Sequence, residues 1–271
     1  MRVVTIARNT MHSPNMATQD AAILSAVEEV LKERGADVTH IEDGEDIPAT
    51  DVVCCMSRTT ATIALLRKAE EQGIKVFNPA NAIRNAERAS FTRLLKVHNI
   101  PQPPSVIGKR DALPQESEFP LWVKRGDGWS CCKEDVCYAK NRDEALAAIE
   151  VLERAGVEEF VYSKHIEGDI IKFYGVDGGF FFHTYPNVEK GKFGWEKVNG
   201  AQKHYPFDIE TMRNIVFAAA KATGLKIFGG DCIVDKEGNI YVVDINDFPS
   251  FGTVRREASV AIAELILRTK R

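Results

Sequence analysis

The chain has 271 residues, enough for one large domain or two to three small ones with proper cores. Its composition, 44% hydrophobic and 27% charged, is typical of an ordinary soluble globular protein. The formal net charge is −4 with no basic block, which argues against nucleic-acid binding, and no apolar run approaches the length of a membrane span.

The N-terminus and the cysteines indicate a cytoplasmic protein. The opening MRVVTIARNT has one Arg and a short apolar run without a cleavage site, and predicts a first strand, not a secretion signal. None of the six cysteines forms a C-x-x-C pair. Cys131, Cys132 and Cys137 could ligate a metal, but no fourth ligand stands at a zinc-site spacing, so free thiols in a reducing cytoplasm are the better interpretation.

The first 80 residues alternate between strand and helix patterns. Short β-rich runs predict strands at 2–7, 37–41, 51–56 and 74–78. Apolar residues at helical spacing predict helices at 18–34 and 60–72, each followed by a glycine. This alternation predicts an α/β fold with a parallel, doubly wound sheet. No G-x-G-x-x-G follows the first strand, so dinucleotide binding is unsupported.

The remaining chain mixes helices and strands as an α+β region does. A helix is expected over 82–98, and the Pro-rich IPQPPS (100–105) after it can neither continue a helix nor join a central strand, so it predicts a boundary or crossing segment. Later strands are expected at 121–125, 136–140, 169–176 and 180–185, and later helices at 143–155, 208–223 and 255–269.

Two polar residues, Asp244 and Asn246, interrupt the β-branched run VVDINDFPSF (242–251). Residues two apart in a strand share a face, so these two should point together while Val243 and Ile245 pack on the opposite side. A carboxylate among buried neighbours must be paired, neutralised or bound to a metal. A strand-end Asp held by backbone amides, or an Asx turn before Pro249, would also explain the pattern.

The preceding residues favour the metal. Residues 229–246 predict a β-hairpin around KEGN, with Asp235 paired to Ile240 and Asp231 directly opposite Asp244, although a five-residue turn would break this register. Opposed like charges repel, so two carboxylates and an amide oxygen on one face need a counter-cation. All-oxygen ligands of this kind suit Mg²⁺.

A lysine, Lys124, ends the predicted strand in FPLWVKRGDGWS (119–130). An exposed strand-end lysine is commonly just solvated, but Gly126 and Gly128 could bring backbone amides close to a phosphate. The loop is not a P-loop, because G-x-x-x-x-G-K-[ST] is absent. Its glycines also suggest that residues 125–135 form a mobile lid.

The segment EFVYSKHIEGD (159–169) predicts an apolar strand that runs into Ser163. A strand edge there would present bare N–H and C=O groups that could pair with a purine, and an ordinary edge strand is the alternative. Lys172 lies in the next strand between apolar neighbours. It would serve a metal–phosphate site if it faced one, and would be unremarkable if it faced solvent.

The order of these segments along the chain resembles that of the ATP-grasp superfamily. The resemblance covers nearly the whole chain and includes the N-P-x-x-A-I-R helix (78–84), with its most specific segment at 228–251, FGGDCIVDKEGNIYVVDINDFPSF. It implies an N-terminal Rossmann-like (pre-ATP-grasp) domain over 1–80, followed by a two-subdomain ATP-grasp fold. The central lid subdomain, with its linker helix, would span 81–165, and the C-terminal subdomain with the metal site would span 166–271.

The resemblance also implies roles for individual residues. Asp231, Asp244 and Asn246 match ligands for one or two Mg²⁺ ions, for which Mn²⁺ can substitute. Lys124 and Arg88 match residues that bind the phosphates of ATP, and Lys172 matches a basic residue near the transferred phosphoryl group. The segment Ser163, Lys164, His165 and Ile166 matches the hinge that binds adenine through its backbone, and Asp169 matches a ribose-side acid.

Two reactions remain open within the superfamily. Carboxylate–amine ligases of the glutathione-synthetase and RimK type phosphorylate a carboxylate, and an amine then attacks the acyl phosphate. Inositol polyphosphate kinases transfer the phosphoryl group to a hydroxyl, and the form D-I-N-x-F-P is more similar to theirs. The ligase is preferred as the commoner small bacterial relative. A catalytically inactive ATP-binding protein is the third hypothesis.

The acceptor is expected to be a small, anionic molecule, but the chain departs from both classes where they keep an Arg. On the strand FFFHTYP (180–186), where both classes usually carry this Arg, the chain has His183 and Tyr185, and Ser250 replaces a glycine that both classes share. The basic residues that could instead hold an anionic group are Lys190, Lys192, Lys197, Lys203 and His204. A solvated lysine loop is the alternative for them, and a homodimer is expected on frequency alone.

Overall fold

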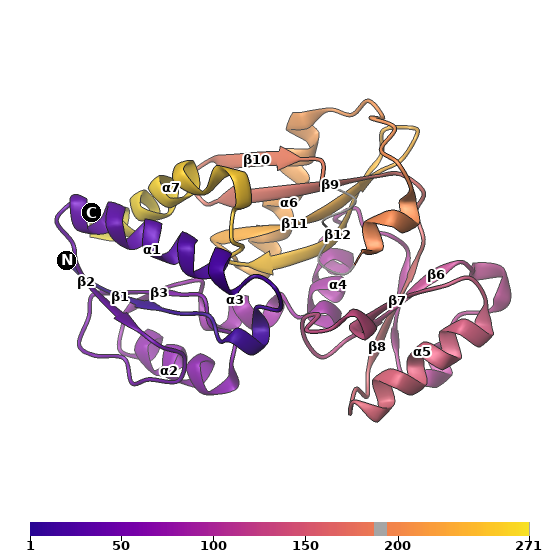
Figure 1. The fold of residues 1–271 in the computed structure, drawn as a ribbon, viewed down its shortest axis with the longest axis horizontal. Helices are drawn as coiled ribbons and strands as arrows, with labels where there is room; N and C mark the ends of the chain where they lie inside the picture. The colour runs from indigo at the N-terminus through magenta and orange to yellow at the C-terminus, as the bar shows by residue number, and fades with distance from the viewer. Residues whose placement is uncertain (187–193, 271) are drawn as a thin grey trace.

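The computed structural model describes residues 1–186 and 194–270, and its strands form three four-stranded sheets (Figure 1). The first sheet is parallel and has the order β2-β1-β3-β4. Its strands are β1 (Arg2–Ile6), β2 (Asp37–Ile41), β3 (Val52–Cys55) and β4 (Lys75–Phe77). The helix α1 (Ala17–Glu33) packs on one face and α2 (Thr60–Glu71) on the other, so the expected doubly wound α/β sheet is confirmed.

The second sheet is antiparallel and has the order β5-β8-β6-β7. Its strands are β5 (Ser105–Gly108), β6 (Leu121–Arg125), β7 (Val136–Ala139) and β8 (Phe160–Lys164), and α5 (Arg142–Arg154) covers one face. The expectation of an edge strand at 159–163 was wrong. β8 lies between β5 and β6, because the chain just after the Pro-rich segment forms an edge strand that the sequence analysis did not identify.

The third sheet is antiparallel, with the order β10-β9-β11-β12. Its strands are β9 (Asp169–Val176), β10 (Phe180–Thr184), β11 (Ile227–Val234) and β12 (Ile240–Asp247). The helix α6 (Ile209–Thr223) covers one face, and α7 (Arg255–Leu267) packs between the other face and α1. Figure 1 shows this α1–α7 pair joining the first and third sheets, with both chain termini beside it.

The helix expected over 82–98 is two helices, α3 (Ala80–Asn85) and α4 (Arg88–Val97). Glu87 between them has extended backbone angles, φ −60° and ψ 140°. The break is compensated by tertiary contacts, because Ala89 N–H donates to the Gly126 carbonyl at 3.0 Å and Arg88 N–H to that of Gly128 at 3.5 Å. The start of α4 is thereby fixed against the loop after β6.

The β11–β12 hairpin brings Asp231 opposite Asp244, as expected, but by a different register near its turn. The turn runs over Asp235–Asn239, so Ile240 pairs with Val234 and not with Asp235. A β-bulge after Asp231 takes up the extra residue and restores the expected pairing. The bulge also turns Val243 toward the same cavity as Asp244, which corrects the expectation that Val243 packs on the opposite side.

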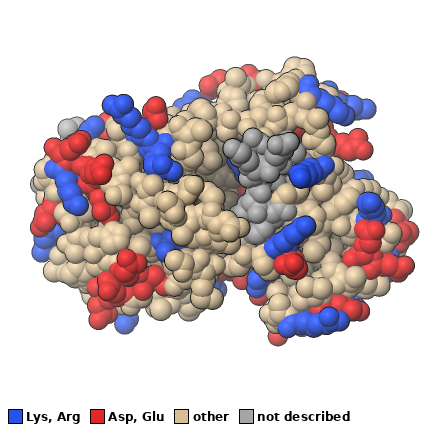
Figure 2. Space-filling view, in the orientation of Figure 1, with Lys and Arg blue, Asp and Glu red and all other residues tan. Residues whose placement is uncertain are grey.

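The surface has no field of one sign on the face drawn in Figure 2, where basic and acidic side chains are interspersed. Among the described residues, no helix combines the length and the apolarity that crossing a membrane requires. Short 3₁₀ turns complete the structure, at Thr10–His12, Arg110–Ala112, Glu116–Glu118, Lys133–Asp135, Trp195–Asn199, Gly252–Val254 and Arg268–Lys270.

The α1–α7 contact predicts a large cost for shortening a side chain within it. Ile262 is fully buried there, so Ile262→Ala should lower the free energy of unfolding by about 2–5 kcal/mol in urea titrations. Ile209, which is 47% exposed, is the matched control, and its change to alanine should cost less than about 1 kcal/mol. Equal losses from the two changes would contradict this packing.

Candidate functional site

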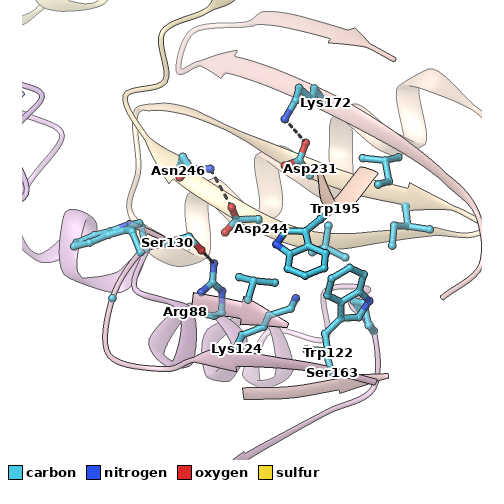
Figure 3. Close-up of a pocket in the computed structure, with 18 of the residues that line it drawn as sticks. Arg88, Trp122, Lys124, Ser130, Ser163, Lys172, Trp195, Asp231, Asp244 and Asn246 are labelled. Atoms are coloured by element: carbon cyan, nitrogen blue, oxygen red, sulfur yellow. Dashed lines mark hydrogen bonds and ion pairs between the residues drawn. The ribbon is translucent and has the colours of Figure 1, made fainter. Parts of the chain in front are cut away.

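A cavity of about 290 Å³ lies between the second and third sheets. Its walls come from β6 and β8 on one side, from β9, β11 and β12 on the other, and from the start of α4 and the loop after β6. Figure 3 shows Asp231, Asp244, Asn246 and Lys172 on the side of the third sheet, and Arg88 and Lys124 on the opposite side. The cavity is therefore a charged cleft between two sheets.

The acidic wall consists of Asp231, Asp244 and Asn246. The two carboxylates belong to directly opposed residues, and Asn246 Nδ2 donates to Asp244 Oδ2 at 3.1 Å. Lys172 Nζ lies 2.9 Å from Asp231 Oδ1, so one carboxylate has a cation partner within the chain. Asp231 is 27% exposed, and all three residues line the cavity.

These residues fit a hard divalent cation. All their ligand atoms are oxygens, and like charges on opposed strand residues gain from a shared cation. Within the described part of the chain no group of three or more His, Cys, Asp and Glu side chains is arranged to hold a metal, so a metal bound here would need the Asn246 amide as its third ligand. Turning that amide by half a rotation exchanges its oxygen for its nitrogen.

The opposite wall carries Lys124 at the end of β6 and Arg88 at the start of α4. Removal from water and, to a smaller extent, the nearby Arg88 lower the pKa of Lys124 to about 8, although Asp244 and Asp231 act in the other direction. Burial also lowers the pKa of Arg88, against the attraction of Asp244. Two cations held together out of water favour an anionic ligand between them.

Arg88 is held in place by the glycine-containing loop after β6. Its Nη2 donates to Ser130 Oγ at 3.0 Å and its Nη1 to the Arg125 carbonyl at 3.4 Å. Gly126 permits this close packing, since a Cβ there would lie 2.6 Å from the Glu159 carbonyl oxygen. The Gly126 amide donates to that same carbonyl, so of the two glycines only Gly128 lines the cavity.

The end of the cavity away from Ser130 is aromatic. Trp122 and Trp195 meet edge to face, with ring centroids 5.6 Å apart, and Ser163 and Lys164 line the wall beside them. Trp122 Nε1 donates to His165 Nδ1 at 3.2 Å, and burial lowers the pKa of His165. A flat, apolar ring fits this end.

Three of the predicted site residues, His165, Ile166 and Asp169, do not line this cavity. The Ile166 carbonyl accepts from Asn199 Nδ2, and the His165 amide donates to the Pro120 carbonyl. Asp169 is buried, and its carboxylate accepts from the amides of Lys203 and Tyr205, so it holds that loop in place. The other eight predicted residues line the cavity: Arg88, Lys124, Ser163, Lys164, Lys172, Asp231, Asp244 and Asn246.

The basic residues expected to hold an anionic acceptor also lie elsewhere. Lys190 and Lys192 fall outside the described residues. The Lys203 ammonium lies 5.7 Å from the Tyr205 ring centre and the His204 ring 4.4 Å from that of Tyr185, and neither lines the cavity, nor does Lys197. His183, on the strand where an Arg was expected, packs against Phe181 and Phe207.

The sequence analysis missed several cavity residues, among them the two tryptophans of the aromatic end and, at the other end, Arg58 and Trp129. The Arg58 guanidinium lies 4.8 Å from the centre of the Trp129 ring, where the loop after β6 meets the first sheet. A signal for Arg58 was present, because it follows the buried strand β3 and the carboxyl ends of parallel strands are where ligands bind in such sheets.

Comparison with known proteins supports the same architecture. No protein-family model matches the chain, and no curated protein matches it by sequence. Among solved structures, D-alanine–D-alanine ligase from Bacillus anthracis is 16% identical, with a TM-score of 0.69 over 100% of this chain and 98% of that one. A RimK domain ATP-grasp protein from Sphaerobacter thermophilus is 14% identical, with a TM-score of 0.71 over 98% of this chain and 100% of that one.

A third match is the ATP-grasp ligase PsnB in complex with the precursor peptide PsnA2 and AMPPNP, which is 18% identical, with a TM-score of 0.64 over 99% of this chain and 98% of that one. Identities this low demonstrate a common fold and leave the activity to be argued from the site. The arrangement of three sheets and the full-length structural matches show that this chain has the ATP-grasp fold.

Proposed function

We propose that the protein is an Mg²⁺- and ATP-dependent carboxylate–amine ligase. The observation that carries the proposal is the pairing of two walls in one cavity: Lys124 and Arg88 face Asp231, Asp244 and Asn246. A triphosphate needs cations on one side and, through its metal, carboxylates on the other. The fold adds support, since the solved structures above are named as ligases or ATP-grasp proteins.

In this proposal the nucleotide spans the cavity from the aromatic end to the Ser130 end. The base lies against Trp122 and Trp195, next to Ser163 and Lys164. Lys124 and Arg88 bind the phosphates. Asp231, Asp244 and Asn246 would hold Mg²⁺, which when bound supplies positive charge to the β- and γ-phosphates.

The proposed reaction has two steps. An acceptor carboxylate oxygen attacks the γ-phosphorus and ADP leaves, so that an acyl phosphate forms. A neutral amine nitrogen then attacks the acyl carbon, phosphate leaves and the nitrogen loses a proton to solvent, so that an amide forms. The chain contributes mainly by binding and orienting the reactants and by offsetting charge, and Lys172, 2.9 Å from Asp231, adds a cation near the transferred group.

The kinase alternative rests on the D-I-N-x-F-P form of residues 244–249, and product analysis separates it from the ligase. The protein is incubated with ATP, Mg²⁺ and pools of amino acids, short peptides and inositol phosphates, and phosphate release and product mass are read together. We expect free phosphate and a product that has lost water. A product heavier by one phosphoryl group, without free phosphate, would instead identify a kinase.

Removing one acidic ligand should stop turnover. Asp244→Asn keeps the side-chain shape but removes one of the two opposed charges, so Mg²⁺-dependent ATP turnover should fall at least about a hundredfold. Asp177→Asn, in an ion pair with Lys226 at the end of the same sheet and away from the cavity, is the control and should keep its turnover. Full Mg²⁺-dependent activity in Asp244→Asn would falsify the metal assignment.

The lowered pKa of Lys124 predicts a pH dependence of nucleotide binding. Lys124 is protonated below about pH 8, and an anionic ligand favours the protonated form. The affinity for AMPPNP with Mg²⁺ should therefore be full below that pH and fall by up to about tenfold per unit above it, with proton uptake on binding near pH 8.

Calorimetric titrations between pH 7 and 9, in buffers of different ionisation enthalpy, measure both quantities. Lys124→Met should bind AMPPNP weakly, and its affinity should not fall above pH 8. Lys75→Met, at an exposed position on β4, should behave as the wild type does. A wild-type affinity that stays constant from pH 7 to pH 9 would rule out this role for Lys124.

A further inference from the structure

The carboxyl ends of β1 and β3 form a crevice beside the cavity. The sheet order β2-β1-β3-β4 reverses between these two strands, because the chain leaves β1 toward β2 on one side and returns to β3 on the other. Open α/β sheets bind ligands at such a reversal, outside the carboxyl ends of the strands. Arg8 follows β1 and Arg58 follows β3, so each side of the crevice carries an arginine.

Both arginines are fixed along part of the guanidinium. Arg58 Nε lies 2.6 Å from Asp247 Oδ1, and its Nη2 donates to the Asp247 carbonyl at 3.2 Å. Arg8 Nε lies 3.2 Å from Asp20 Oδ2, and its Nη2 donates to the same Asp247 carbonyl at 3.0 Å. A shared acceptor means that the two guanidinium groups lie next to each other. Their side chains are only 8% and 4% exposed.

Several buried polar atoms of the crevice have no hydrogen-bond partner among the described residues. Two of them, Arg8 Nη1 and Trp129 Nε1, are donors, and a third is His12 Nδ1, whose ring lies beside that of Trp129. The Asp247 carboxylate also lacks a hydrogen bond but is held by its ion pair with Arg58, and the Arg58 hydrogen bond to the Asp247 carbonyl comes from Nη2 and not from Nη1. An arginine or indole N–H can only donate. Buried donors without acceptors are costly, so the group that completes this crevice is an acceptor.

The charge of the crevice disfavours a phosphate dianion. Arg8 is paired with Asp20 and Arg58 with Asp247, so the four groups carry no net charge in excess. A group with a single negative charge and a planar pair of oxygens suits the remaining Nη1 donor better than a phosphate dianion does. Arg58 and Trp129 line the cavity that also holds Asp244 and Ser130, so this group lies within the candidate site.

We propose that Arg58 binds a carboxylate of the acceptor substrate, supported by Trp129 against its guanidinium and by Arg8 behind it. This inference rests on the proposed ligase function and names the class of acceptor that the site takes, a free amino acid or a short peptide with its carboxylate intact. The sequence analysis expected lysines to hold the anionic group of the acceptor, but none of those that the structure describes lines the cavity. In this proposal Arg58 holds that group instead.

The test measures binding, not turnover. Wild-type protein with AMPPNP and Mg²⁺ is titrated with amino acids and dipeptides as free acids, with the same compounds as carboxamides, and with inorganic phosphate. Thermal shift and tryptophan fluorescence report binding. We expect free acids to bind, carboxamides to fail, and Arg58→Lys and Arg58→Gln to weaken free-acid binding by roughly 10- to 100-fold.

Two further variants guard against misfolding and general charge effects. Arg58→Gln leaves Asp247 buried without its cation, so Arg58→Gln/Asp247→Asn, which removes both charges, is measured beside it. Arg67→Gln, at an exposed position on α2, is the matched control and should bind the free acids as the wild type does.

Each outcome decides the inference. Equal binding of acids and carboxamides, unchanged acid binding in both Arg58→Gln proteins, tighter binding of phosphate than of carboxylates, or no acid binding beside normal AMPPNP binding would overturn it. A parallel loss of AMPPNP and acid binding in the Arg58 variants would also overturn it, as a collapse of the cavity. If the wild type bound acids through Arg58 but did not bind AMPPNP, this subsite would stand and the proposed function would fail.

Discussion

The structure of the site depends on one unfavourable contact, the opposition of Asp231 and Asp244 on neighbouring strands. Like charges on opposed residues destabilise a sheet, and here the hairpin holds them together. Lys172 offsets one carboxylate at 2.9 Å, while Lys124 and Arg88 attract the other from across the cavity. Asp231 is thus in contact with its cation, whereas Asp244 faces the cations of the opposite wall across the cavity. Such a space favours a ligand that brings both a cation and anionic groups.

Each part of the chain supplies one component of this balance. The third sheet carries the carboxylates and the second sheet carries Lys124. Arg88 comes from α4, whose start is fixed by the two hydrogen bonds to the glycine-containing loop. The first sheet contributes Arg58, which is attached to the end of β12 through Asp247. The cavity therefore forms only when all three sheets are packed together, and the α1–α7 contact joins two of them.

The Arg58–Asp247 pair also determines which atom of Arg58 can bind the proposed acceptor carboxylate. A fully buried carboxylate needs its cation, so removing either partner alone is costly. The pair holds Arg58 through Nε and Nη2 and leaves Nη1 as the atom that can meet a ligand. An arginine fixed in this way loses little side-chain entropy on binding, which favours a planar carboxylate.

Much of this protein could be predicted from its sequence, because the signals were local. Alternating strand and helix patterns predicted the doubly wound sheet, and the spacing of two between Asp244 and Asn246 predicted a shared face. The position of Lys124 at a strand end before glycines could also be predicted, and so could the hairpin that carries Asp231. The opposition of Asp231 and Asp244 was predicted by a turn that is one residue too short, and a bulge compensated for the difference.

The misses concern contacts between distant segments. The helix over 82–98 is broken because hydrogen bonds from the loop after β6 replace those of the helix, and no local pattern reports them. β8 is central because a strand 55 positions earlier pairs with it, as Ser105 with Ser163 through Gly108 with Phe160. Asp169 was predicted as a site residue, but its carboxylate accepts hydrogen bonds from two amides of a loop that returns to it.

The sequence by itself determined the kinds of element and the chemistry of the two walls, since both follow from neighbouring residues. Only the tertiary structure decided which side chains enter the cavity, Arg58 among them, because that depends on how the three sheets pack.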